Sequence, residues 1–597
     1  MRTLGAALLL PVLALAVLVG AAGPAATTDA APNKRPNVVV ILADDVALMD
    51  FGAYGGEART PNIDALAARG ALFTQYRASP LCSPSRAMLL TGIDAHKTGV
   101  ATIPEVLPAE QKGRPGYSMA LERGVLTLAD RLRAAGYRTV MAGKWHLGEA
   151  PDEMPQAHGF DRSFALAASG ADNWDDRSYM PYYKDAPWFD NGVEASLPED
   201  FYSSRFIVDT AIRYLAETDQ DKPFFAYLPF QAIHIPVQAP RKFVERYKGR
   251  YDAGWEALRR ERHRKAQTLG LIPQGAPPAA LPQEFRPWTS LPPETRALYA
   301  ARMEVNAAML EAMDFHVGRL IAHLKAKGQY DNTIFVVSSD NGPEPSRGDD
   351  SVSLAAYHRL TGYDIGPGNM GGRGHWGFIG PEWAAAAATP GAWFKFYATE
   401  GGIRVPLIVA GPGLAPQKVT SPAMVTDIAP TLLAWVGVDP ARSPGKAITG
   451  RSLLPVLSGA AASAYGPDEA RAVEVSGNSA LYLGDYKITR SVPPVGDGQW
   501  RLYNLARDPG ETTDLSASEP AVKARLLSEY DAYAKRVGVL PMPEGYDSQT
   551  QITRNIGARL LGNYPWLYGL LGGIAVLVAV AMWLALRRLL RRRAANT

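Results

Sequence analysis

The sequence predicts an α/β protein with three parts: a large, mostly parallel sheet sandwiched by helices, a smaller C-terminal α+β subdomain with an antiparallel sheet, and a C-terminal transmembrane helix. Short β-branched runs alternate with helical patterns over residues 35–460, which is typical of parallel sheets covered by helices. Over residues 461–545 the strand-like runs become short and closely spaced. An uncharged apolar stretch over residues 564–586 then precedes the end of the chain.

The first of these parts supplies the strands of the large sheet. Its candidate strands are mostly apolar and β-branched, as expected of strands that are buried on both faces. A helix is predicted over Thr127–Arg133, because Thr127 can cap it and Asp130 can complete a capping box. A long helix is expected from about Glu294 to Lys327. In chain order, the predicted strands are Val38–Leu42, Arg138–Met141, Phe224–Leu228, Ile334–Val337 and Val405–Val409.

The smaller subdomain is predicted from about residue 461 to residue 545. Short runs separated by turn residues predict an antiparallel sheet, and helical spacing over Pro520–Val537 predicts a helix that closes it. The proline-rich residues 272–293 are expected to form a surface excursion, and residues 546–563 a linker. The four strand-like runs are Glu474–Val475, Ala480–Leu483, Tyr486–Thr489 and Trp500–Leu505.

Both ends of the chain have the pattern of membrane-directed segments. Residues 1–26 begin with Arg2, continue as an apolar run and end in small residues, which predicts a secretory signal peptide, with an uncleaved anchor as the alternative. Pro565–Leu586 has no charged residue and, as a helix, would span a bilayer core of about 30 Å. Five arginines in residues 587–597 predict a basic cytoplasmic tail. We therefore expect a membrane-anchored protein whose body, residues 27 to about 560, is exported and faces the periplasm from a bacterial inner membrane.

Composition and charge exclude several classes of protein. The chain has 597 residues, of which 47% are hydrophobic and 20% are charged, so it is not a disordered protein. Its formal charge of +3 becomes −3 without Arg2 and the five arginines of the tail. A mildly acidic body has no electrostatic footprint for nucleic acid, and we expect no such partner. Cys82 is the only cysteine, so the chain can form no internal disulfide.

Polar residues follow four of the predicted strands at the point where each strand ends. Because the carboxyl ends of parallel strands meet at one edge of a sheet, we expect these side chains to lie together. Four of them offer oxygen ligands, which suit Ca²⁺ or Mg²⁺ rather than zinc. Adjacent aspartates can also cap helices, but two acidic pairs at two strand ends favour a cation site. The residues are Asp44, Asp45, Lys144, His146, His234, Asp340 and Asn341, and the oxygen donors among them are Asp44, Asp45, Asp340 and Asn341.

The segment around Cys82 is the most informative of the chain. Pro84 suits the first turn of a helix, which places Cys82 at the N-terminus of that helix. An anion at such a position meets free backbone N–H groups and the positive end of the helix dipole. Arg86 lies about one turn later and adds a guanidinium that can bind a tetrahedral oxyanion. A buried structural cysteine is the alternative, but Ser83 and Ser85 make this neighbourhood polar.

The run Cys82-Ser83-Pro84-Ser85-Arg86 resembles the Cys-x-Pro-x-Arg signature of the sulfatase family, of the formylglycine-dependent arylsulfatase type within the alkaline-phosphatase-like superfamily. The resemblance covers nearly the whole body of the chain, from Pro36 to about Leu540. It also includes Asp44-Asp45, the run Gly143–Gly148, Asp340-Asn341-Gly342, Lys395 with Glu400-Gly401-Gly402, and Asp508-Pro509-Gly510-Glu511.

The resemblance implies a role for each of these residues. A maturation enzyme would convert Cys82 to formylglycine, whose hydrate supplies the nucleophilic oxygen. Ca²⁺, with Mg²⁺ as the alternative, would be held by Asp44, Asp45, Asp340, Asn341 and the modified Cys82. Arg86 and Lys144 would orient formylglycine and sulfate. His234 and Lys395 would bind sulfate and protonate the leaving group, and His146 would help to release sulfate from the covalent intermediate.

Three functions remain open from the sequence. The first is a sulfatase that hydrolyses aryl or alkyl sulfate esters. The second is a phosphonate or phosphate ester hydrolase of the same superfamily, although those relatives tend to have a histidine in place of Asn341. The third is an inactive, membrane-tethered binding protein, which the retention of every charged group argues against. His96, near the end of the Cys82 helix, is expected to brace a loop, and Gly380–Trp383 is expected to line the entrance for the substrate.

Overall fold

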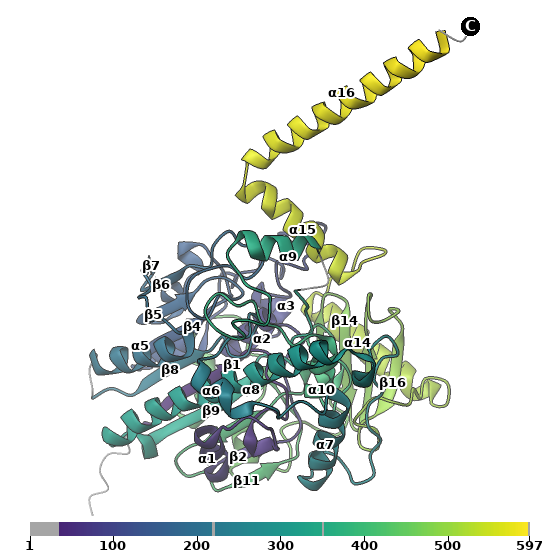
Figure 1. Ribbon diagram of the computed structural model, residues 1–597. Helices are drawn as coiled ribbons and strands as arrows, with labels where there is room; N and C mark the ends of the chain where they lie inside the picture. The colour runs from purple at the N-terminus through teal and green to yellow at the C-terminus, as the bar shows by residue number, and fades with distance from the viewer. Residues whose placement is uncertain (1–34, 218–220, 349–351, 595–597) are drawn as a thin grey trace, which may run out of the picture. The chain divides into compact units, whose positions relative to one another are not determined.

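The computed structural model describes residues 35–217, 221–348 and 352–594. The predicted signal peptide, residues 1–26, lies outside them. The described residues from Pro36 onward belong to one unit of the chain, drawn in Figure 1. The unit contains two principal sheets: a ten-stranded sheet in the order β11-β2-β10-β9-β1-β8-β4-β5-β6-β7, and a four-stranded sheet in the order β13-β14-β15-β16.

The centre of the large sheet is parallel, as predicted. Five adjacent strands run in the same direction, and four of them are the runs that the sequence indicated. All seven residues of β1 are buried, which explains why the run has no polar face. The five strands are β9 (Thr333–Ser339), β1 (Asn37–Ala43), β8 (Phe224–Pro229), β4 (Arg138–Lys144) and β5 (Arg162–Leu166).

Antiparallel pairs occur on both sides of this parallel centre, so the sheet is mixed and the prediction of a mostly parallel sheet is wrong there. β10 (Leu407–Ala410) runs against β9, because it begins beside Ser338 at the carboxyl end of β9 and extends back along that strand. Four short strands complete the sheet. They are β2 (Ala71–Phe73), β11 (Gln417–Val419), β6 (Trp188–Asp190) and β7 (Val193–Glu194).

Helices cover both faces of the large sheet, as expected from the alternating side chains of a strand. On one face, Val39 and Ile41 belong to a core shared with α1 (Pro61–Arg69), α5 (Ser203–Glu217) and α8 (Pro293–Ala326). On the other face, Val38, Val40 and Leu42 belong to a second core, shared with α2 (Cys82–Thr91), α4 (Leu128–Ala134) and α12 (Ile428–Trp435). The helices predicted before β4 and β9 are thus confirmed as α4 and α8.

The small antiparallel sheet is confirmed, with consecutive strands paired in chain order. α14 (Pro520–Val537) packs on it through Leu526 and Tyr530 (Figure 1). Residues 548–563, in the expected linker, form α15 (Ser548–Asn563), and Asn555 in it donates to the carbonyls of Pro104, Glu105 and Leu107. The strands are β13 (Arg471–Val475), β14 (Asn478–Leu483), β15 (Tyr486–Arg490) and β16 (Trp500–Asn504).

Shorter elements connect these layers. A separate two-stranded parallel sheet pairs β3 (Tyr76–Arg77) with β12 (Ala423–Met424). The remaining helices are α3 (Ala95–Thr98), α6 (Arg241–Val244), α7 (Trp255–Thr268), α9 (Val352–Leu360), α10 (Pro381–Ala387), α11 (Glu400–Ile403) and α13 (Leu454–Leu457).

The end of the chain differs from the expectation. Residues 566–594 form one helix, α16 (Trp566–Ala594), which includes the arginine cluster as well as the apolar stretch before it. Among the residues that the structure describes, no helix combines the length and the apolar character needed to cross a bilayer. The predicted transmembrane helix over residues 564–586, and with it the membrane-anchored localisation, is therefore wrong. α16 continues past the uncharged run into the arginines that the sequence analysis assigned to a separate cytoplasmic tail.

Candidate active site

The ends of four parallel strands and the start of one helix bring the predicted residues together. Asp44 and Asp45 follow β1, Lys144 ends β4, and His234 lies in the loop after β8. Cys82 is the first residue of α2. All the predicted site side chains are buried, with exposed fractions between 0% and 7%. They are Asp44, Asp45, Cys82, Arg86, Lys144, His146, His234, Asp340, Asn341 and Lys395.

Asp44 lies between two cations and the thiol. Its Oδ2 is 2.6 Å from Lys144 Nζ and 3.1 Å from Arg86 Nη2, and its Oδ1 is 3.6 Å from Cys82 Sγ. Although burial opposes its charge, Lys144, His234 and Arg86 hold the pKa of Asp44 well below its usual range. Asp44 is therefore an ionised carboxylate in contact with the residue expected to supply the nucleophile.

Arg86 joins two carboxylates rather than pointing into open space. Its Nε and Nη2 donate to Asp340 Oδ2 at 2.9 and 2.7 Å, and its Nη1 donates to the Lys144 carbonyl at 3.0 Å. Together with the contact to Asp44, these bonds use all three nitrogens of a side chain that is 0% exposed. The sequence suggested that Arg86 binds an oxyanion, but here its geometry makes it the group that positions Asp44 and Asp340.

Two buried oxygens at the centre of the site have no hydrogen-bond partner. Asn341 Nδ2 donates to Asp45 Oδ1 at 2.6 Å, which leaves Asn341 Oδ1 and Asp45 Oδ2 without a donor among the described residues. Ligand atoms of Asp44, Asp45, Cys82 and Asp340 all lie within 4.8 Å of one another. Buried oxygens without donors are costly, so this arrangement fits a hard cation with oxygen ligands.

Asp45 itself is held in an unusual conformation. Its φ of +65° lies in the left-handed region, which residues other than glycine rarely adopt. Burial raises the pKa of Asp45 well above its ordinary value; Lys395 opposes this effect, and the neighbouring Asp44 adds to it. A cation beside Asp45 would compensate the negative charge of its carboxylate and so favour the ionised form of this buried side chain. Backbone strain of this kind is typical of functional sites.

Lys395 and His234 form the other wall of the site. Lys395 Nζ is 2.8 Å from both Asp45 Oδ1 and Glu344 Oε2. Although burial opposes its charge, Asp45 raises the pKa of Lys395 well above its ordinary value, so the amine is protonated. His234 Nδ1 is 2.6 Å from the Ile235 carbonyl, which only accepts, so Nδ1 carries the proton and Nε2 is free to accept one. Burial and Lys395 lower the pKa of His234 to about 3.

Sequence reasoning missed Glu344. It is 6% exposed, lies beside Lys395 and accepts from the backbone N–H of Ser346 at 2.9 Å. Although burial raises its pKa, Lys395 and His234 bring the pKa of Glu344 below its ordinary value. The signal was the short run Asp340-Asn341-Gly342-Pro343-Glu344, in which a third acidic side chain follows two predicted ligands.

His146 and Cys82 complete the site. Both ring nitrogens of His146 are buried without a partner among the described residues, and its φ is +55°. Burial and Lys144 lower the pKa of His146 well below its usual range, so the ring is neutral. Burial also raises the pKa of the Cys82 thiol well above its ordinary value, despite Lys144 and Lys395. An unmodified Cys82 is therefore a protonated thiol and a poor nucleophile.

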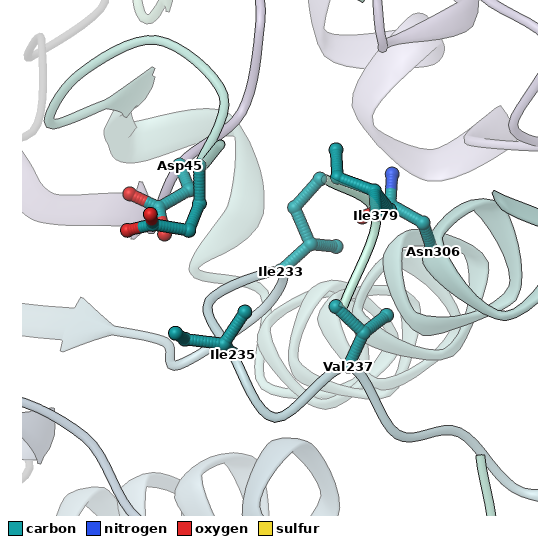
Figure 2. Close-up of a pocket in the computed structure, with 7 residues that line it drawn as sticks. Asp45, Ile233, Ile235, Val237, Asn306 and Ile379 are labelled. Carbon is teal, nitrogen blue, oxygen red and sulfur yellow. The ribbon is translucent and has the colours of Figure 1, made fainter. Parts of the chain in front are cut away.

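A small cavity adjoins the acidic side of the site. Asp45 and Glu344 lie on one side, and Figure 2 shows Ile233, Ile235 and Ile379 around it. Such apolar walls exclude water, which strengthens the electrostatic interactions of the carboxylates beside them. The expected entrance segment Gly380–Trp383 is buried instead: Trp383 is 0% exposed and packs edge-on against Trp255, and only the preceding Ile379 reaches the cavity.

The later motifs of the resemblance connect the small sheet to the loop that carries Lys395. Glu400 pairs with Arg77 at 2.8 Å and with Lys487 at 3.1 Å, and its backbone N–H donates to Glu511 at 2.8 Å. A Cβ on Gly402 would lie 2.0 Å from the Tyr397 carbonyl, so only glycine allows this close approach. These residues fix the position of the loop and lie outside the set around Cys82.

The family model and the curated relatives agree on one family. The model of the Sulfatase family matches residues 36–438. The chain is 35% identical over 459 residues to an arylsulfatase of Klebsiella aerogenes, covering 74% of this chain and 94% of the relative. It is 34% identical over 559 residues to an uncharacterized sulfatase of Schizosaccharomyces pombe, covering 88% and 97%. The crystal structure of Ps i-CgsB in complex with k-i-k-neocarrahexaose shares the fold, with a TM-score of 0.60 and 22% identity over 88% of this chain and 98% of that one. The chain belongs to the sulfatase family and is a sulfate ester hydrolase.

Proposed function

We propose that the protein hydrolyses aryl or alkyl sulfate esters with Cys82, converted to formylglycine, as the source of the nucleophile and with a divalent cation beside it. The observation that carries this proposal is the pair of buried, donor-less oxygens of Asp45 and Asn341 in the immediate surroundings of Cys82. Packing alone does not explain a pair of buried oxygens that have no donor among the described residues.

The donor set supports a hard cation. Asp44, Asp45, Asp340 and Asn341 would hold it, with Ca²⁺ as the expected ion and Mg²⁺ as the alternative, because every donor is an oxygen. Such a cation would withdraw electron density from a sulfate oxygen and offset the carboxylate charges. Arg86 would keep Asp44 and Asp340 in place, since its guanidinium contacts both. This role makes Arg86 a positioning residue.

The environment of position 82 supports a modified nucleophile. Because burial raises the pKa of the thiol, an unmodified cysteine would not be ionised near neutral pH. Formylglycine, produced by a maturation enzyme, would in its hydrated form place a hydroxyl oxygen where the thiol stands. Asp44 Oδ1, which is 3.6 Å from the sulfur, would accept a hydrogen bond from that hydroxyl.

Other side chains of the site would bind the sulfate group and donate or accept protons. Lys144 and Lys395 are buried cations of the site and would bind the negative oxygens of the ester. Lys395 carries a proton that it can donate to the departing oxygen. His146, neutral with free ring nitrogens, would accept a proton when sulfate is released. His234 would accept a hydrogen bond or a proton at Nε2.

Mass spectrometry of the peptide around Cys82 tests the nucleophile. Protein produced together with a formylglycine-generating enzyme should contain formylglycine at this position, and Cys82→Ala should lose aryl sulfate turnover.

The substrate class is tested by comparing turnover of matched aryl sulfate, phosphate and phosphonate esters, of which the sulfate should be hydrolysed fastest. A wild-type rate in Cys82→Ala would contradict the covalent route, and a clear phosphonate preference would contradict the substrate class.

Removal of divalent ions tests the cation. Exhaustive chelation should abolish aryl sulfate turnover, and Ca²⁺ should restore it. Ca²⁺ should also raise the melting temperature of the chelated Cys82→Ala variant, because the carboxylates still lie within a few ångströms of one another. Full activity after chelation, together with a melting temperature that Ca²⁺ does not change, would rule out a cation at this place.

A further inference from the structure

A second cavity lies away from the residues around Cys82. It has a volume of about 210 Å³, many times the 10–15 Å³ or so that one water requires. It is lined by residues that follow α2, by the segment after β12, by the start of β13 and by the end of α14. Met88 of α2 reaches it, whereas Cys82 begins the same helix at its other end. None of the proposed site residues lines this cavity.

Arg471, on the wall of this cavity, is a buried cation that forms no ion pair with an acidic side chain among the described residues. The side chain is 9% exposed, and its Nε is buried with no hydrogen-bond partner among the described residues. Its guanidinium lies 5.5 Å from the ring centroid of Tyr465 and 5.7 Å from that of Tyr482. Burial and the nearby Arg77 lower the pKa of Arg471, and the opposing charge of Asp427 does not offset them.

The acidic side chains around the cavity already have other partners. Glu469 pairs with Arg451 at 2.5 Å. Asp94 accepts from His96 at 3.1 Å and from the Tyr533 hydroxyl at 2.8 Å. Neither carboxylate is therefore available to compensate Arg471.

Behind the cavity wall, Asp427 is occupied by neutral donors. It accepts from the Tyr465 hydroxyl at 2.6 Å and from the backbone N–H groups of Arg451 and Met424 at 2.8 and 2.7 Å.

Two more cations, Lys97 and Arg536, line the cavity, and neither forms an ion pair within the part of the chain that the structure describes. The walls thus have an excess of positive charge.

We propose that this cavity binds a small molecule through an oxyanion group, such as a sulfate, phosphate or carboxylate. The planar guanidinium of Arg471 can donate two parallel hydrogen bonds to such a group, and Lys97 and Arg536 add charge at the same cavity. A buried charge is retained in proteins when it is paired, and the bound anion supplies the pair. This site is separate from the proposed reaction, so its occupancy does not depend on formylglycine or on a cation.

Binding of inorganic sulfate and inorganic phosphate to the full chain tests the proposal. In equilibrium dialysis, Arg471→Met should bind one anion fewer per chain than the wild type, or bind it at least about tenfold more weakly. Arg442→Met is the matched control, because Arg442 is exposed and lies outside the cavity; it should bind like the wild type. Aryl sulfate turnover at low anion concentration should stay within about twofold of wild type in both variants, since neither residue belongs to the reaction site.

A second variant keeps the test decisive if Arg471→Met does not fold. The double substitution Lys97→Met and Arg536→Met removes two surface charges of the cavity and should weaken binding of the same anion severalfold. Acetate in parallel dialysis shows whether a carboxylate suffices. Equal anion stoichiometry and affinity in the wild type and in every folded cavity variant would overturn the proposal, because the two tyrosine rings alone would then account for the buried guanidinium.

Discussion

Glu344 shows at the scale of one residue how the structure extends the sequence. Its carboxylate is 2.8 Å from Lys395 Nζ, and Lys395 in turn contacts Asp45. Glu344 thus fixes the amine between two carboxylates and compensates its charge. It does so without lying among the four oxygen donors expected to hold the cation, which makes it a positioning residue.

We predict that Glu344→Gln lowers kcat for aryl sulfate hydrolysis by about 10- to 100-fold, the size of effect typical of residues that orient site groups. The neutral amide no longer holds the Lys395 ammonium, so the proton donor is less well placed for the leaving group. Steady-state kinetics measure the change, which should be smaller for an ester whose leaving group needs no proton. Glu529→Gln, at an exposed position on α14, is the matched control. If Glu344→Gln lowered kcat equally for esters whose leaving group needs a proton and for those whose leaving group does not, Glu344 would have no role in proton donation.

At the scale of elements, the start of α4 holds the loop before β5, the strand that pairs with β4. Thr127 Oγ1 accepts from the Asp130 N–H at 3.1 Å, and Asp130 Oδ2 accepts from the Thr127 N–H at 2.9 Å. The same hydroxyl donates to the His158 carbonyl at 2.7 Å. The capping box that the sequence indicated therefore has a second function, which is to hold the loop before β5.

Thr127→Ala should lower the free energy of unfolding by about 1–2 kcal/mol, because the helix loses its cap and a buried carbonyl loses its donor. Chemical denaturation measures this change. Thr127→Ser retains the hydroxyl and should lose much less. The kcat of both variants should match that of the wild type, since no site residue moves; a Thr127→Ser variant as unstable as Thr127→Ala would contradict the cap as the cause.

The elements also show what a sequence can and cannot predict. β1 and β9 were predictable to within a residue or two, because each is a continuous apolar run that is buried on both faces. The direction of β10 was not, since it depends on where the chain returns after the site loop. Among the site residues, the ends of strands were informative, whereas the use of Arg86 as a bridge between Asp44 and Asp340 depends on side-chain geometry. The transmembrane helix was predicted from the uncharged run and the arginines after it, whereas no helix of the described residues has the length and apolar character to cross a bilayer.

At the scale of the whole molecule, His96 connects the large sheet's helices to the small sheet. Its Nδ1 is 3.1 Å from Asp94 and its Nε2 is 2.7 Å from Glu474 of β13, while Tyr533 of α14 donates to Asp94. The ring also packs edge-on against Tyr117. Although burial opposes the charge, Asp94 and Glu474 raise the pKa of His96 from 6.5 to about 10. This agrees with the expected bracing role.

His96→Gln should destabilise the protein by about 3–5 kcal/mol near neutral pH, because two buried carboxylates lose their cation. Since the pKa of His96 is raised in the folded state, its contribution is complete below about pH 6.5 and is lost as the pH rises through about 10. The difference in melting temperature between the wild type and His96→Gln should therefore be largest near pH 6.5 and should decrease toward pH 10. Melting temperatures across that window measure it, with His323→Gln on α8 as the control. A constant difference would show that His96 contributes through packing and not through its charge.

The burial of Cys82 has a consequence for the timing of biosynthesis. The side chain is 3% exposed, the Ser83 hydroxyl donates to the His146 carbonyl at 2.8 Å, and the Ser85 hydroxyl receives the Ser79 N–H at 2.8 Å. A second enzyme has no access to a thiol enclosed in this way. If position 82 is converted as proposed, the conversion must happen while the polypeptide is still extended, in competition with folding. A host cell with too little of the modifying enzyme would then accumulate protein that is correctly folded but permanently inactive.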